Sequence, residues 1–194
     1  MAFYTVDELK SLKLRCFGEN VLISNKASIY NPSKISIGNN VRIDDFCVLS
    51  AGDGGIEIGD YIHIAVFCSL IGAGKIVLGD FANLSSRVSI YSSNDDYSGE
   101  FLTNPMVPSK FTGVTHADVL IGKHTIIGSG SVVLPGIILE EGVTVGALSL
   151  VNKFCKSFGI YAGVPARRIG ERKRNLLILE RQMLHKEGYS CENE

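Results

Sequence analysis

The sequence contains no tryptophan, only five prolines and no Cys-x-x-Cys pair among its five cysteines. An odd cysteine count without paired spacing argues against a disulfide framework, so we expect Cys47 and Cys68 to be small buried side chains. No uninterrupted apolar run is long enough to cross a bilayer. The four histidines are scattered along the chain, and their spacing predicts no metal site.

The sequence has no excess of positive or negative charge, because the net charge of its 194 residues is only -1. The chain therefore has no global field that would attract nucleic acid or a membrane surface, and we expect neither as a partner. The basic run at 166–174 lacks interleaved aromatic residues, which does not favour nucleic-acid binding. Residues 1–18 include acidic side chains and no apolar core, so we expect no signal peptide and a cytoplasmic location.

What the sequence does contain is a six-residue repeat. Aliphatic side chains recur at every sixth position from Ile127 to Val151, which matches neither the period of a helix nor that of a strand. A period of six fits one short strand followed by one tight corner, and three such units make a coil of about 18 residues. Stacked coils form a parallel β-solenoid. The alternative, a β-sandwich, predicts turns every 8–12 residues without a fixed six-residue phase.

The phase of the repeat slips near 50–57, 70–77 and 95–120, where we expect loops to leave the solenoid. The last gap is the longest and predicts an extended loop over 92–118, because a long segment without repeat units interrupts a regular scaffold. Loops of that kind carry function in many proteins.

Both ends of the repeat are flanked by segments with helical signals. Thr5 and Glu8 have the spacing of a capping box, which predicts a short N-terminal helix. Near the C-terminus, Leu176, Leu179 and Met183 share one face of a predicted helix that caps the last coil or packs on a neighbouring subunit. The chain is thus divided into an N-terminal cap (1–20), a solenoid (21–165) and a C-terminal helix (166–194).

The segment from Gly146 to Gly170, GALSLVNKFCKSFGIYAGVPARRIG, narrows the function. Its AGVPAR run and the preceding repeats resemble the hexapeptide-repeat acyltransferases, which include galactoside, maltose and serine acetyltransferases. The resemblance implies an all-β left-handed parallel β-helix with short capping helices. It also implies a homotrimer with acetyl-coenzyme A as co-substrate in clefts between subunits, and no permanently bound cofactor.

The same resemblance assigns residues to coenzyme A. Small residues at the coil surface would let the narrow pantetheine arm approach, and basic residues would bind its phosphates by charge-assisted hydrogen bonds. The implied coenzyme A-binding residues are Ser129, Gly146, Ala147, Asn152, Lys153, Arg167 and Arg168.

In the resembling galactoside and maltose enzymes a general-base histidine lies at the start of the loop, where this sequence has Asp95. A carboxylate of ordinary pKa is a weak base for a sugar hydroxyl, whereas a neutral amine attacks a thioester with less help. The sequence therefore favours N-acylation, and its loop resembles that of small O-antigen acyltransferases that act on dTDP-4-amino-4,6-dideoxyglucose. We predict catalytic roles for Asp95, Asp96 and His116.

Substrate contacts are predicted for Asn83, Asn94 and Tyr97, and the remaining histidines, His63, His124 and His185, are expected at the surface. Several alternatives stay open. One is O-acetylation of a saccharide with His116 as the base, and more distant ones are a scaffold without catalysis and a γ-type carbonic anhydrase. The resembling galactoside enzymes carry a substrate-binding asparagine where this sequence has Arg87, so its substrate contacts must differ.

Overall fold

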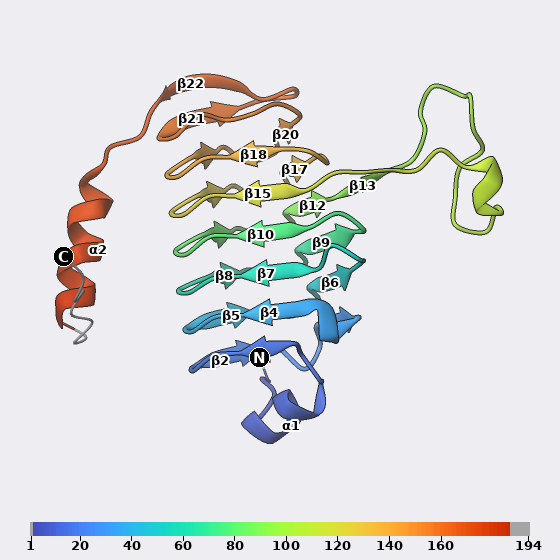
Figure 1. The fold of residues 1–194 in the computed structure, drawn as a ribbon. Coiled ribbons are helices and arrows are strands. Elements are labelled where there is room, and N and C mark those ends of the chain that lie inside the picture. Colours follow the sequence, from blue (N-terminus) through green and yellow to red (C-terminus); the bar gives the residue numbers. More distant parts are fainter. Residues whose placement is uncertain (1, 187–194) are drawn as a thin grey trace, which may run out of the picture.

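The computed structural model describes residues 2–186, which form a triangular solenoid of about seven turns with one parallel sheet on each side (Figure 1). The first sheet contains β1 (Cys16–Phe17), β4 (Ile35–Ile37), β7 (Ile56–Ile58), β10 (Ile76–Leu78), β15 (Val119–Ile121) and β18 (Ile138–Leu139). The second contains β2 (Val21–Ile23), β5 (Val41–Ile43), β8 (His63–Ile64), β11 (Asn83–Leu84), β16 (Ile126–Ile127), β19 (Thr144–Val145), β21 (Gly159–Ala162) and β22 (Arg167–Glu171). The third contains β3 (Ser28–Tyr30), β6 (Val48–Ala51), β9 (Ser69–Gly72), β12 (Ser89–Tyr91), β17 (Val132–Val133) and β20 (Leu150–Val151).

The core of the solenoid is built by the six-residue repeat. All five aliphatic positions of the regular stretch, Ile127, Val133, Leu139, Val145 and Val151, are at most 2% exposed. Each buried side chain of this size contributes about 1.5–3 kcal/mol of hydrophobic stabilisation. The cysteines predicted at small corner positions are also fully buried and free, which confirms that prediction.

The expected loops near 50–57 and 70–77 are absent, and this prediction is wrong. Both segments are tight turns that stack on each other, because the amides of Gly52 and Gly54 donate to the carbonyls of Gly72 and Ala73 at 2.9 and 2.8 Å. The added residues lengthen the coil without leaving it.

The loop at 92–118 does leave the solenoid and extends away from it (Figure 1). Leu78 pairs with Ile121, 43 residues later, whereas Ile121 pairs with Leu139, only 18 residues later. The insertion therefore leaves the register of the first sheet intact. Its stem is an antiparallel pair, β13 (Ser93–Asn94) and β14 (Thr115–His116), and it carries a 3-10 turn, η2 (Ser109–Phe111).

The N-terminal cap is the helix α1 (Val6–Ser11), and the predicted capping box is confirmed. The Glu8 amide donates to Thr5 Oγ1, and the Thr5 amide donates to the Glu8 carboxylate at 2.7 Å. A second short turn, η1 (Pro32–Lys34), precedes β4.

The C-terminal segment differs from the predicted single helix over 166–194. Its first part is the strand β22, which pairs antiparallel with β21 at the end of the second sheet. Helix α2 (Asn175–Lys186) follows and lies beside the solenoid rather than on its last coil (Figure 1). Of the residues predicted on one face, Leu176 and Met183 are half-buried, whereas Leu179 is 56% exposed within the single chain, so packing of this face on a neighbouring subunit stays a prediction. The predicted range also includes 187–194, which lie outside the described residues.

Helix α2 is docked through Glu180, whose side chain is only 9% exposed and contacts Lys123 and His124. His124 is 8% exposed and stacks on Phe81, so the expectation of a surface histidine is wrong at this position. The ring is buried because α2 covers it, a contact between residues 56 positions apart. Within residues 2–186, no helix is both long and apolar enough to span a bilayer.

Candidate active site

Several predicted site residues border the third sheet, whereas Asn83, Arg167 and Arg168 lie on strands of the second sheet. We call the boundary where the chain passes from the second to the third sheet the entry edge. Ser129 and Ala147 lie there, before β17 and β20. The boundary where the chain leaves the third sheet is the exit edge, and Asn94 and Asp95 lie there after β12. The strands of the third sheet separate the two groups within one chain.

Local packing explains why the entry edge has a glycine at position 128. A Cβ on Gly128 would lie 2.5 Å from the Ala147 amide nitrogen, so the coils approach too closely for any side chain at that position. Below the surface, the buried hydroxyls of Ser131 and Ser149 donate to the Gly146 carbonyl at 2.9 and 2.7 Å. These two hydrogen bonds hold the carbonyl of Gly146, a predicted coenzyme A-binding residue, in place.

Ser129 and Ala147 are exposed at this edge, as a cofactor-binding role requires. Their backbone amides have no hydrogen-bond acceptor within the described residues, whereas the amides of Gly128, Gly146 and Leu148 are all bonded. Unpaired exposed amides are suitable donors for the carbonyl oxygens of a ligand.

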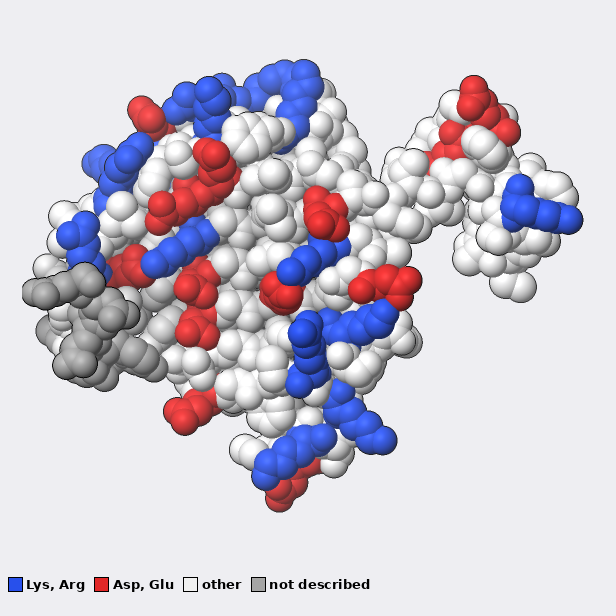
Figure 2. Space-filling model, in the orientation of Figure 1, with Lys and Arg blue, Asp and Glu red and all other residues white. Residues whose placement is uncertain are grey.

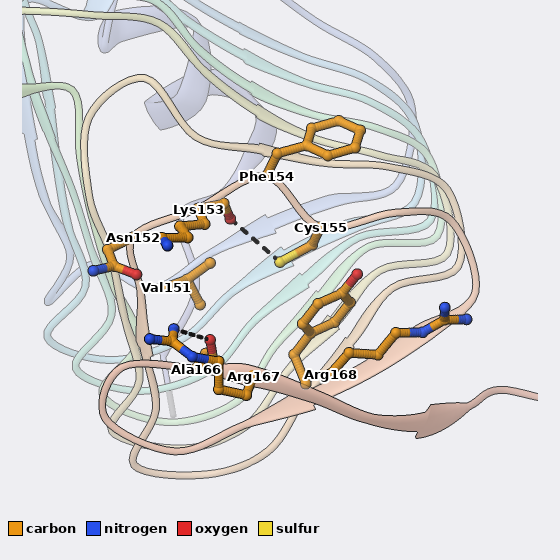
Figure 3. A pocket seen from close by; sticks show the side chains of 9 residues that line it. Val151, Asn152, Lys153, Phe154, Cys155, Ala166, Arg167 and Arg168 are labelled. Carbon is orange, nitrogen blue, oxygen red and sulfur yellow. Dashed lines mark hydrogen bonds between the residues drawn. The ribbon is translucent and has the colours of Figure 1, made fainter.

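A pocket of about 170 Å³ lies at the C-terminal end of the solenoid (Figure 3). Its lining includes Asn152 and Lys153, which follow β20, and Arg167 and Arg168 from β22. The side chains of Asn152, Lys153 and Arg167 lie on one side of the pocket, whereas Arg168 extends to the other side and pairs with Glu171 at 3.1 Å. The structure thus brings three of these four predicted residues together.

The end of the solenoid around this pocket is rich in Lys and Arg (Figure 2). Neither Lys153 nor Arg167 has a carboxylate partner within residues 2–186, and the Arg167 guanidinium donates to the Ala166 carbonyl at 3.0 Å. Two exposed cations without an anionic partner can bind phosphate groups through charge-assisted hydrogen bonds.

A second pocket, of about 350 Å³, lies at the exit edge. Three predicted residues, Asn94, Asp95 and Tyr97, line it together. The other lining residues, Tyr91, Ser93, Val132 and Leu134, come from β12, β13 and the region of β17. Sequence reasoning missed these four, although the outward-facing positions of strands beside a predicted loop were a usable signal.

Asp96 has different surroundings from Asp95. Its carboxylate accepts a hydrogen bond from the Ser98 hydroxyl at 2.7 Å and further bonds from the amides of Ser98, Gly99 and Phe101. The Ser98 hydroxyl and these amides lower the pKa of Asp96 to about 2. Asp96 therefore closes a turn of the loop, in contrast to its predicted catalytic role.

His116 and Asn83 do not line the exit-edge pocket. His116 lies on β14, opposite β13, with its Nδ1 2.8 Å from the Ser93 hydroxyl and its ring exposed. Asn83 lies on the second sheet, in register with His63 and Ile126. Within one chain, Asn83 therefore does not meet Asn94 or Tyr97.

His63 belongs to a cluster that the sequence did not reveal. Its Nε2 lies 2.9 Å from Asp44, which also accepts a hydrogen bond from Arg42 Nε at 2.7 Å. Burial acts to raise the pKa of Asp44, but the hydrogen bonds from Arg42 and His63 hold it below its ordinary value. Within the described residues, no group of His, Cys, Asp and Glu side chains has the geometry of a metal site.

Comparison with known proteins identifies the family of the chain. Residues 118–153 match the family model of the bacterial transferase hexapeptide (six repeats). Over 180 residues the chain is 57% identical to the dTDP-4-amino-4,6-dideoxy-D-glucose acyltransferase of Escherichia coli, which covers 93% of this chain and 94% of the relative. The chain belongs to the hexapeptide-repeat acyltransferases.

Two crystal structures of AntD, an N-acyltransferase from Bacillus cereus, superpose on this acyltransferase with a TM-score of 0.91 and 47% identity. One is a single-residue variant in complex with dTDP-4-amino-4,6-dideoxyglucose and coenzyme A, with 95% of this chain and 97% of AntD covered. The other contains dTDP and 3-hydroxybutyryl-coenzyme A, with 96% and 98% covered. The predicted solenoid fold and the predicted enzyme class are thereby confirmed.

Proposed function

We propose that this acyltransferase transfers the acetyl group of acetyl-coenzyme A to the 4-amino group of dTDP-4-amino-4,6-dideoxyglucose. The 57% identity over nearly the whole length of an enzyme named for this sugar carries the proposal. The exit-edge pocket supports it, because the pocket offers a carboxylate, an amide and a phenol but no histidine. Such groups suit an amine nucleophile better than a hydroxyl.

In the proposed reaction, the neutral amine of the sugar attacks the thioester carbonyl carbon and forms a C–N bond. The tetrahedral intermediate expels the thiolate of coenzyme A as the C–S bond breaks. The carboxylate of Asp95 accepts the proton that the nitrogen loses, and a proton from solvent neutralises the thiolate. The unpaired Ser129 amide is a donor for the oxyanion of the intermediate.

Coenzyme A would lie against the entry edge, where Ser129, Gly146 and Ala147 leave room for the pantetheine arm. Its phosphates would bind at the C-terminal end, where Asn152, Lys153 and Arg167 gather. Arg168 would contribute long-range attraction rather than a direct contact, because its guanidinium is paired with Glu171.

We propose that the enzyme works as a homotrimer in the cytoplasm and supplies a sugar for O-antigen or another cell-surface polysaccharide. Its candidate groups occupy two edges of the third sheet, so a neighbouring copy is required to bring both sets to one substrate. The measured mass of the particle in solution should be three times the 21.0 kDa of the chain.

One observation favours O-acetylation of a saccharide as a second candidate. His116 is exposed, and the contact of its Nδ1 with Ser93 leaves Nε2 without a partner in the described structure. An oriented imidazole of this kind can act as a general base toward a hydroxyl.

The deciding experiment combines acetyl-coenzyme A with either dTDP-4-amino-4,6-dideoxyglucose or its 4-hydroxy counterpart, dTDP-6-deoxyglucose, and follows release of free thiol. We expect thiol release with the amino sugar only, and mass spectrometry should show one acetyl group added to it. Thiol release with the hydroxy sugar alone would favour O-acetylation, and no release with either would overturn the proposal. Substitution of 3-hydroxybutyryl-coenzyme A tests whether the donor is acetyl.

A further inference from the structure

One residue per coil adopts the left-handed backbone conformation at the entry edge. We call these residues the entry-edge column: Phe46, Phe67, Arg87, Gly130 and Leu148, with φ between 55° and 72°. Because the same conformation recurs at the same corner, successive side chains project outward one above another. The rings of Phe46 and Phe67 stack with centroids 5.1 Å apart and an interplanar angle of 16°.

Arg87 ends this stack. Its guanidinium carbon lies 5.0 Å from the centroid of the Phe67 ring, a cation–π contact that orients the planar group. Arg87 forms no ion pair within residues 2–186. At the other end of the stack, Lys26 lies over Phe46 and is paired with Asp45 at 3.5 Å. Lys26, which lies outside the column, is thus neutralised by Asp45, whereas Arg87, the cation of the column, is not paired with a carboxylate within residues 2–186.

The position of the column directly after Arg87 has no side chain of its own. The next member is Gly130, which has no side chain, and Leu148 from the following coil lies over this position. A Cβ on Gly130 would be 2.8 Å from Leu148 Cδ2. The Arg87 guanidinium is therefore stacked on the Phe67 ring, Leu148 lies over Gly130 in the next coil, and the Arg87 side chain is exposed to solvent.

The segment before Arg87 adds hydrogen-bond donors. The hydroxyls of Ser85 and Ser86 and the amide of Ser86 have no partner within the described residues. The carboxylates of this corner, Asp44 and Asp45, lie two coils away, roughly 10 Å along the solenoid. A planar cation, two hydroxyls and an amide without a nearby carboxylate form an anion site, and arginine matches the geometry of phosphate oxygens.

We propose that Arg87 binds the diphosphate of the nucleotide-linked acceptor and is thereby a specificity-determining residue, an inference that rests on the proposed function. The diphosphate of coenzyme A is a less suitable ligand, because its candidate partner Lys153 lies two coils away and Arg167 lies still farther away, at the C-terminal end. The pantetheine arm extends from those phosphates past Ser129, so the thioester end of the donor approaches the level of Arg87. The acceptor must bind at that end.

The test compares Arg87→Gln, Arg87→Lys and Phe67→Leu with the wild type and with Arg181→Gln, an exposed control on α2. Loss of charge-assisted hydrogen bonds should raise the KM for dTDP-4-amino-4,6-dideoxyglucose roughly tenfold to a hundredfold in Arg87→Gln. The KM for acetyl-coenzyme A should stay within about twofold. Phe67→Leu keeps the positive charge of Arg87 but removes the aromatic ring that supports it. This variant should therefore raise the KM for the amino sugar by a smaller factor. Arg87→Lys should lie between these two variants, because lysine cannot form the two-pronged contact.

Calorimetry with dTDP alone separates this inference from the proposed function, since it needs no turnover. We expect wild type to bind dTDP and Arg87→Gln to lose most of that affinity, with equal thermal unfolding of the two proteins. If wild type binds dTDP but has no transferase activity, the proposed function fails and the inference stands. Equal dTDP affinity in the two proteins, or no dTDP binding by wild type, would overturn the inference. The inference would also be overturned if Arg87→Gln raised the KM for acetyl-coenzyme A without raising the KM for the amino sugar.

Discussion

Asp95 and Asp96 are consecutive in sequence, yet they have different surroundings in the structure. Asp95 is exposed and lines the exit-edge pocket, whereas Asp96 accepts hydrogen bonds from three amides and one hydroxyl of its own turn. A side chain that already holds a turn is poorly placed to accept a proton from a substrate. The two residues therefore make a matched pair for separating catalysis from loop structure.

We expect Asp95→Asn to lower kcat roughly a hundredfold or more, in the range that removal of a general base gives. The KM for acetyl-coenzyme A should change little, because Asp95 is not near Lys153 or Arg167. Steady-state thiol release measures both quantities, and His116→Ala is the comparison. A large loss of kcat in His116→Ala with an active Asp95→Asn would instead assign the base to the histidine.

Asp96→Asn should affect order in the loop rather than chemistry. The depressed pKa of about 2 means that the ionised turn is favoured above the ordinary carboxyl pKa and is lost as the pH falls through about 2. The amide of asparagine mimics the neutral acid at every pH, so amides 98–101 should exchange faster with solvent in this variant. Hydrogen exchange measures this, and an unchanged exchange rate would contradict the role of Asp96 in the turn.

The residue scale also shows where sequence reasoning succeeds. Cys47 and Cys68 were predictable because a repeat imposes the same small side chain at each corner. The burial of His124 was not predictable, since it depends on a helix 56 positions later. The Asp96 turn had a local signal, because an aspartate followed by Ser98 and Gly99 is typical of a turn closed by a carboxylate.

At the scale of elements, helix α2 is attached to the solenoid chiefly through one polar contact. Glu180 is packed against Lys123 and His124, and the Arg172 guanidinium also donates to the Gly142 carbonyl at 3.3 Å. Leu176 and Met183 of the predicted apolar face are half-buried, whereas Leu179 is exposed within the single chain. The polar contact of Glu180 with Lys123 and His124 is the part of the docking that the apolar spacing did not indicate.

We expect Glu180→Gln to weaken docking of α2 by about 1.5–3 kcal/mol, the usual value of a hydrogen bond to a charged group. Burial acts to raise the pKa of Glu180, but hydrogen bonds from Lys123 and His124 hold it below 4.5. The docking energy is therefore present above pH 4.5 and is lost as the pH falls through the lowered value. Limited proteolysis of α2 across this range measures it, with Arg181→Gln as the exposed control. Equal cleavage of Glu180→Gln and wild type at neutral pH would contradict the role of the contact.

Strand β22 is a second element whose structure the local sequence did not predict. Residues 167–171 lie beyond the six-residue phase, and their charged residues resemble a helix start. They form a strand because the last coil leaves the edge of β21 unpaired, and an antiparallel return segment satisfies its backbone groups. Such a requirement arises from the assembled solenoid and not from the local sequence.

At the scale of the whole molecule, the six-residue repeat predicted the parallel stacking of coils, because every coil has the same sequence of buried aliphatic and small corner positions. It also located the 92–118 loop, whose 25 additional residues are absorbed without a shift in register. The six-residue repeat does not indicate how chains associate with one another. That association must be inferred from how far apart the candidate site residues lie in one chain.

Arg87 lies before β12 and Asp95 after it, at opposite edges of the third sheet, and a six-residue side of the solenoid spans roughly 20 Å at 3.3 Å per residue. In the proposed acceptor, the diphosphate and the amine are attached to opposite sides of a single pyranose ring, which is much smaller than that distance. One chain therefore cannot offer both residues to the same sugar. We infer that Arg87 of one subunit works with Asp95 of the partner subunit.

Co-expression of Arg87→Gln and Asp95→Asn chains tests this arrangement at low acceptor concentration, where each variant alone is nearly inactive. In randomly mixed copies of the proposed trimer, about a quarter of the sites would combine an intact Arg87 with an intact Asp95 from the neighbouring chain. The mixture should therefore recover about a quarter of wild-type kcat/KM, whereas the separately expressed proteins, combined after assembly, should recover almost none. Residues that act within one chain would give no recovery in either case, because every chain in the mixture carries one of the two substitutions.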